Sequence, residues 1–171
     1  GISMTLNIES MLVPTLTRAL VAMKGYLEKG EAHAKEKGFD ASVLVNARLS
    51  PDMHPLKRQV QMTTDTVRRL LCQLGEMDVP AVEDTEETIE ALQQRIDSTL
   101  EFIAAFDTAK LKGAEERSVT LPIGPDGLTL DATTFMMGFG LPNLYFHATT
   151  TYNILRHNGV QIGKMDFLGA P

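Results

Sequence analysis

The sequence predicts a mainly α-helical protein, organised as a four-helix bundle with a small β-hairpin before the last helix. Four segments carry apolar residues at steps of three and four, which is the repeat of one helix face. After Arg117 the repeat changes to two, which indicates paired strands. With 171 residues, 43% of them hydrophobic, the chain is long enough to bury the core of one domain.

The first two helices are indicated by apolar stripes and by the residues that flank them. The first is expected over residues 7–37, with Asn7 as its N-cap. Pro14 lies inside this stripe, so the helix either bends there or starts near it. The second is expected over residues 55–74, where Pro55 occupies the first helical position and its missing N–H costs nothing.

The third helix has the cleanest amphipathic pattern of the chain. Its apolar residues follow one another at helical spacing from Ile89 to Phe106. Asp84, with Glu87 three residues later, resembles a capping box. We therefore expect this helix to start near residue 84.

A change of period separates the third helix from the last. Val119 and Leu121 alternate with polar residues, and a Gly-Pro-Asp-Gly turn at 124–127 follows, which predicts a β-hairpin. Because two strands are not stable alone, the hairpin is expected to pack on the bundle. The last helix is expected over residues 142–158, with Pro142 in its first turn.

Composition argues against several functional classes. A net charge of −6 argues against a nucleic-acid-binding protein, which needs a basic face. No apolar stretch approaches the roughly 20 residues that cross a bilayer, and no signal peptide is visible. The single cysteine, Cys72, lies in an apolar stripe and is expected to be a buried thiol. We expect a single domain over residues 4–171, located in the cytoplasm.

Two of the four histidines are candidates for a functional site. His54 stands directly before Pro55, and His147 lies in the first half of the last helix among apolar neighbours. Each also has an ordinary interpretation: His54 could hydrogen-bond a loop carbonyl, and His147 could be a core histidine with a polar partner. His33 is expected at the charged surface, and His157 near the C-terminus of the last helix, where the helix dipole favours a cation.

Two segments of the chain resemble an uncharacterised bacterial family. These are PNLYFHATTTYNILRHNGVQIGKMDFLG, residues 142–169, and SPDMHPLKRQVQ, residues 50–61. The family is the domain of unknown function numbered nineteen-ninety-three, placed in the superfamily of DinB/YfiT-like proposed metalloenzymes. The resemblance extends over nearly the whole chain, and it implies a DinB-like up-down four-helix bundle.

The resemblance also implies a metal site. DinB-like proteins typically hold a divalent metal with three histidines, one from the second helix and two from an HxxxH pair on the last. His54 resembles the first ligand and His147 the second, whereas the third position is Thr151. A threonine hydroxyl is a poor ligand for Zn or Ni, so the site is incomplete by this pattern. Other candidates for the third ligand are Asn143, Gln61, Asp52 and water.

We expect the His54 and His147 rings to approach each other across one end of the bundle, if the second and fourth helices begin at that end. Tyr145, Thr150 and Thr151 would add polar groups to this pocket.

Two functional classes follow from this reasoning. In the first, the protein is a small-molecule binding or interaction module with a degenerate metal site. In the second, it is a divergent metal-dependent enzyme of the thiol-dependent transferase or hydrolase type. We also expect a homodimer, because DinB-like bundles often pair and the first helix carries a broad apolar stripe with Met11 and Met23.

Overall fold

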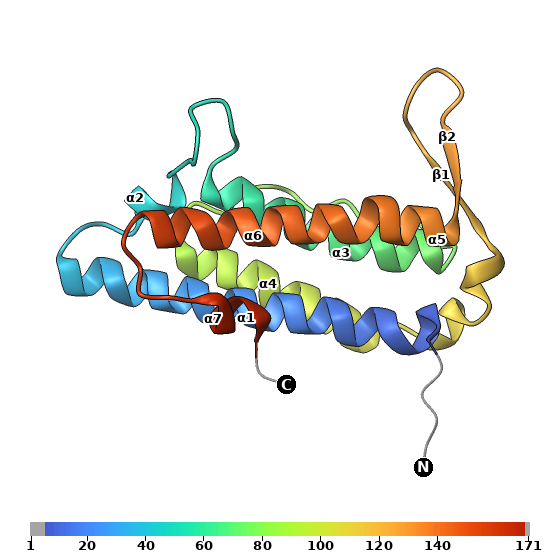
Figure 1. Ribbon diagram of the computed structural model, residues 1–171, viewed down its shortest axis with the longest axis horizontal. Coiled ribbons are helices and arrows are strands. Elements are labelled where there is room, and N and C mark those ends of the chain that lie inside the picture. Colours follow the sequence, from blue (N-terminus) through green and yellow to red (C-terminus); the bar gives the residue numbers. More distant parts are fainter. Residues whose placement is uncertain (1–5, 170–171) are drawn as a thin grey trace, which may run out of the picture.

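The computed structural model describes residues 6–169 and shows four long helices packed side by side (Figure 1). The long helices are α1 (Ile8–Lys37), α3 (Leu56–Leu74), α4 (Ile89–Ala105) and α6 (Leu141–His157). The shorter elements are α2 (Ser42–Val45), η1 (Thr108–Leu111), η2 (Ala114–Glu116), β1 (Ser118–Leu121), β2 (Leu128–Asp131), α5 (Ala132–Thr134), the π-helical η3 (Phe135–Gly140) and α7 (Lys164–Leu168). The predicted bundle, with a hairpin before its last long helix, is confirmed.

The predicted up-down order needs one refinement, because α3 and α4 run in the same direction. Arg95 of α4 contacts Thr64 and Asp65 of α3, and one turn further along Ser98 lies beside Arg68. The connection, residues 75–88, therefore returns along the whole bundle before α4 begins, and we call it the crossover. Figure 1 shows the resulting order: α1 and α6 run one way, and α3 and α4 run the other.

The start of α1 agrees with the sequence prediction. The Asn7 side chain accepts a hydrogen bond from the Ser10 N–H at 2.9 Å, which caps the helix. The helix then continues through Pro14 to Lys37, so the alternative start near the proline is wrong. It ends at Gly38, whose positive φ of 76° suits glycine.

The predicted start of the third helix is wrong. The N-cap of α4 is Thr88, whose hydroxyl accepts from the Ala91 N–H at 3.0 Å. Asp84 instead forms ion pairs with Arg58 and Arg95, so its carboxylate ties the crossover to the bundle rather than capping a helix.

Helices α3 and α6 approach each other closely and run antiparallel. Gly140 ends η3 directly before α6, and a Cβ on it would lie 2.2 Å from Leu70 Cδ2 of α3, so only glycine fits there without movement. The segment that the sequence marks with glycine breakers nevertheless stays helical: α5 and the π-helical η3 lead directly into α6. Pro142 lies in the first turn of α6, as predicted.

The hairpin packs on the bundle through one face of β1. Val119 and Leu121 are buried, and the two strands pair with Val119 opposite Leu130. The far end of the hairpin projects from the bundle (Figure 1).

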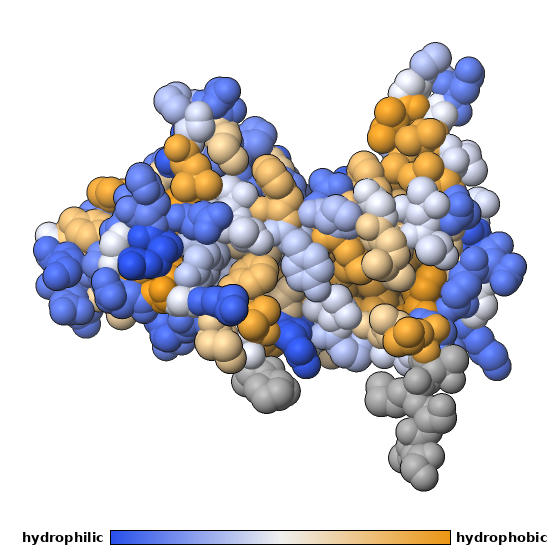
Figure 2. All heavy atoms as spheres, viewed as in Figure 1, coloured by the Kyte–Doolittle hydropathy of each residue, from blue (hydrophilic) through white to orange (hydrophobic). Residues whose placement is uncertain are grey.

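The apolar stripe of α1 mainly forms core. Met23, which the dimer prediction used, is fully buried, whereas Met11 is 39% exposed. Cys72 is buried as predicted, and burial raises the pKa of its thiol. Apolar side chains also appear in patches on the surface between α1 and α6 (Figure 2). Within residues 6–169, no helix combines the length and apolar character needed to span a membrane.

Candidate functional site

His147 is bound to α3 through the side chain of Gln59. The His147 Nδ1 and Gln59 Oε1 atoms lie 2.7 Å apart, which joins the middle of α6 to the first turn of α3. The amide nitrogen of Gln59 donates to the His54 carbonyl at 3.1 Å. Gln59 therefore connects the two candidate histidines, one through its ring and the other through its backbone.

These contacts fix the tautomer of His147. Because the Gln59 amide nitrogen is a donor to His54, its oxygen must accept, so Nδ1 of His147 carries the proton. Burial, together with the positive charges of His54 and Arg58, lowers the pKa of His147 below its ordinary value of 6.5. The ring is therefore neutral at pH 7, with an unprotonated Nε2 that can accept a hydrogen bond or bind a metal.

His54 is exposed, and it contributes to the lowered pKa of His147. It lies in the loop before α3, and its carbonyl accepts a hydrogen bond from the Gln59 amide nitrogen. The ordinary interpretation of His54 placed its ring on a loop carbonyl, and no such hydrogen bond occurs among residues 6–169.

The expectation that the second and fourth helices begin at the same end of the bundle is wrong, although Gln59 contacts both histidines. Helices α3 and α6 begin at opposite ends of the bundle (Figure 1). His147 reaches the first turn of α3 because it lies near the middle of the 17-residue α6. The antiparallel packing then brings this midpoint level with Gln59.

Two of the candidates for the third ligand use their polar atoms within α6 and the segment before it. Thr151 is fully buried, and its hydroxyl donates to the His147 carbonyl at 2.8 Å. The Asn143 amide donates to the Phe139 carbonyl at 2.7 Å. Thr150, a pocket candidate, makes the same kind of bond to the Phe146 carbonyl. These bonds join a side chain to the carbonyl four residues earlier, so they stabilise local structure.

The other two candidates, Gln61 and Asp52, are engaged elsewhere in the fold. Gln61 receives a hydrogen bond from Arg58 and donates to Glu86, which places its amide in the contact between α3 and the crossover. Asp52 is exposed and accepts a hydrogen bond from the Ser50 hydroxyl. This hydrogen bond is the main cause that lowers the pKa of the Asp52 carboxyl.

Tyr145 is 42% exposed and lines a cavity beside α1 and α7. It therefore does not turn inward to the histidine pair.

The donor set does not fit a catalytic metal centre. Among residues 6–169, no three His, Cys, Asp or Glu side chains come together as a group that could hold a metal ion. Two imidazoles remain, and catalytic zinc sites typically use three protein ligands.

Sequence reasoning missed Gln59, which the structure places at the centre of this site. The residue is 2% exposed, so its amide needs hydrogen-bond partners within the fold. This need for partners was the signal available in the sequence. The partner itself, His147 on α6, lies 88 residues further along the chain, so a local pattern could not identify it.

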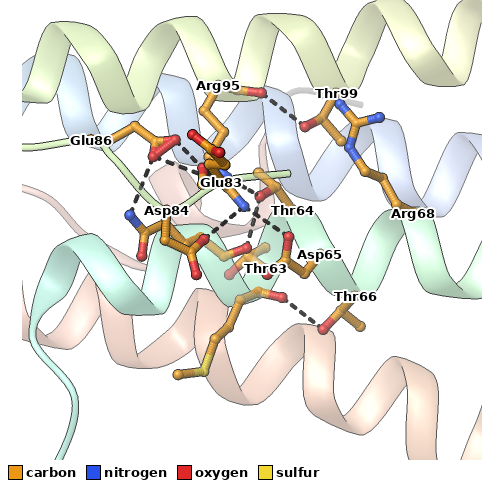
Figure 3. Close-up of polar contacts among 12 residues, drawn as sticks. Thr63, Thr64, Asp65, Thr66, Arg68, Glu83, Asp84, Glu86, Arg95 and Thr99 are labelled. Atoms are coloured by element: carbon orange, nitrogen blue, oxygen red, sulfur yellow. Dashed lines mark hydrogen bonds and ion pairs between the residues drawn. The ribbon is translucent and has the colours of Figure 1, made fainter. Parts of the chain in front are cut away.

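The largest cluster of charged side chains lies elsewhere, between α3, α4 and the crossover (Figure 3). Arg95 donates from Nη1 to Glu86 Oε1 at 2.8 Å, from Nη2 to Asp65 at 2.8 Å and from Nε to Thr64 at 2.8 Å. Its Nη1 also reaches the Glu83 carbonyl at 2.9 Å. Every guanidinium nitrogen is thus occupied by the chain itself, which makes the cluster structural.

Glu86 is the most buried carboxylate of this cluster. Burial alone would raise the pKa of Glu86, but the hydrogen bonds and charge of Arg95 outweigh it and hold the pKa below its ordinary value. The cluster anchors the crossover to both helices.

The remaining histidines lie apart from this site. His33 is half-buried, with its ring edge-on to Phe39 at a centroid distance of 5.9 Å, so the expected surface position holds only in part. His157 is exposed in the last turn of α6, as predicted.

Comparisons with known proteins agree with this architecture. A solved structure described as a DinB family member protein from Shewanella denitrificans superimposes with a TM-score of 0.88 and is 38% identical in sequence. The match covers 93% of this chain and 90% of the other. No curated protein matches the chain. The model of a domain of unknown function, DUF1993, matches residues 9–168, and the chain therefore belongs to this family.

Proposed function

We propose that the chain is a small-molecule binding or interaction module with a degenerate metal site at His54 and His147. The observation that supports this proposal most is the position of Thr151. The residue is buried, and its hydroxyl is committed to the His147 carbonyl. Two imidazoles without a further nitrogen, sulfur or carboxylate ligand hold a divalent ion weakly, because each lost ligand removes a coordinate bond.

A divergent metal-dependent enzyme, of the thiol-dependent transferase or hydrolase type, is the second candidate. Gln59 favours it, because metal-binding histidines usually donate their other ring N–H to an oxygen, as His147 does here. Such an enzyme would need a third ligand from outside the described residues, supplied by water or by a substrate.

The experiment is a titration of protein without a histidine tag with Zn²⁺ and with Ni²⁺, read by isothermal calorimetry. The parent is expected to bind with a Kd weaker than about 1 μM, a binding free energy of about −8 kcal/mol, compared with about −10 to −16 kcal/mol for complete structural zinc sites. Replacing His54 or His147 with alanine should abolish this binding.

The matched control is His157→Ala, which removes an exposed histidine from the same helix as His147. It should leave binding unchanged. Binding that survives both His54→Ala and His147→Ala would refute the site. Nanomolar binding that depends on both residues would favour the enzyme.

We also propose that the protein works as a homodimer in the cytoplasm. The supporting observation is that α1 exposes Met11 and Val21, the latter by 54%. Light scattering at micromolar concentration should report twice the chain mass of 18.8 kDa, and a monomer would reject the proposal.

A further inference from the structure

A cavity of about 600 Å³ lies between α1, α6 and α7, and neither candidate histidine lines it. Small-molecule sites typically occupy about 300–1,000 Å³, so the volume is sufficient for a ligand. Its walls are mostly apolar. They include Pro14 and Ala19 from α1 and Met165 and Phe167 from α7. Figure 2 shows apolar patches on the surface between α1 and α6, two of the helices that border this cavity.

Arg18 is the one charged residue that lines this cavity. Two other cations of α1 are neutralised by partners, because Lys24 pairs with Asp97 and Lys29 with Asp166. Arg18 forms no ion pair or hydrogen bond within residues 6–169. Asp166 cannot compensate it fully, since one of its oxygens binds Lys29 and the other accepts the Gly163 N–H.

Tyr145 lines the same cavity from α6. Its oxygen has no hydrogen-bond partner in the part of the chain that the structure describes. An arginine and a tyrosine from two different helices therefore line a mostly apolar space, and neither polar group has a partner among residues 6–169. A carboxylate suits both groups, because it accepts from the guanidinium and from the O–H.

The apolar wall is held in place but remains exposed. The Phe167 ring packs edge-on to Tyr152 at a centroid distance of 6.3 Å, and the Asp166–Lys29 ion pair ties α7 to α1. Met165 is nevertheless 70% exposed and Leu168 47% exposed. A ligand with a hydrocarbon part would cover this surface, which is favourable in proportion to the apolar area removed from water.

We propose that this cavity binds an amphipathic monocarboxylic acid, with the carboxylate on Arg18 and Tyr145 and the hydrocarbon chain against α7. The proposal names a ligand class for a binding module, but it does not depend on metal binding. Failure of the histidine site would leave it intact.

The test uses NMR of the full chain carrying ¹³C-labelled methionine methyl groups, titrated with decanoate below its micelle concentration. Met165 lines the cavity and reports on it. Met137, which is 58% exposed on η3 and does not line the cavity, is the control for unspecific adsorption. We expect a saturable shift of the Met165 signal and no shift of Met137.

Two comparisons test the role of charge. Arg18→Gln should weaken decanoate binding by about tenfold or more, as expected for the loss of a charge-assisted contact. Decanol should bind more weakly than decanoate to the parent, and equally to the parent and the variant. Because Arg18 is exposed and unpaired, the variant should keep the helical circular dichroism of the parent.

Three outcomes would overturn the proposal. One is the absence of a saturable Met165 shift. The second is equal binding of decanoate to the parent and to Arg18→Gln. The third is a shift of Met137 as large as that of Met165, which would show unspecific adsorption.

Discussion

Replacing Arg95 with methionine should destabilise the bundle strongly. The Arg95 side chain is 4% exposed and Glu86 is 10% exposed, so the change leaves a buried carboxylate without its charged partner. Breaking one partner of a buried pair costs about 3–5 kcal/mol. The Asp65 and Asp84 contacts add little, at most about 1 kcal/mol each, since these carboxylates are 36% and 40% exposed.

The assay is urea unfolding at pH 7, followed by circular dichroism and analysed as a two-state transition. Lys24→Met is the matched control, because it removes a cation from an ion pair whose side chains are 37% and 50% exposed. This control should cost no more than about 1 kcal/mol. If Arg95→Met costs no more than Lys24→Met, Arg95 does not anchor the crossover and the cluster is not structural.

Three further predictions concern packing and pH. Gly140→Ala should cost about 1–3 kcal/mol in urea unfolding, because its Cβ would collide with Leu70, whereas Gly138→Ala has its nearest neighbour at 3.9 Å and should not destabilise. Acid should destabilise the parent as the pH falls below about 4.5, the ordinary pKa of Glu86, toward its lower folded pKa. Glu86→Gln should lose less stability over this range, and the remaining loss comes from other carboxyls with lowered pKa values, such as Asp131 and Asp166. Stability should also fall as the pH drops below 6.5 toward the folded pKa of His147, because the unfolded state binds the proton more readily, and His147→Gln should remove that slope.

Local signals in the sequence predicted most of the fold. The apolar stripes located the four long helices, and Asn7 and Pro142 marked two of their beginnings, because capping and proline preferences act within one helical turn. The same signals misplaced the start of α4. There the carboxylate of Asp84 is used for ion pairs with residues far along the chain, which a local pattern cannot reveal.

The candidate site was predictable only in part, for a similar reason. The family resemblance brought His54 and His147 together, and in the structure Gln59 contacts both the His147 ring and the His54 carbonyl. Gln59, which orients His147, was not found, because the contact depends on antiparallel packing of α3 and α6. The parallel course of α3 and α4 could not be predicted either, because no local pattern in residues 75–88 shows that this connection returns along the bundle.

The metal content of the protein tests the central claim most directly. Protein purified without a histidine tag, and without added metal or chelator, would be analysed by inductively coupled plasma mass spectrometry. A two-imidazole site at His54 and His147 predicts much less than one zinc or nickel ion per chain, because weakly held ions are lost during purification. One ion per chain, absent from His147→Ala, would contradict the degenerate site and favour a metal-dependent enzyme.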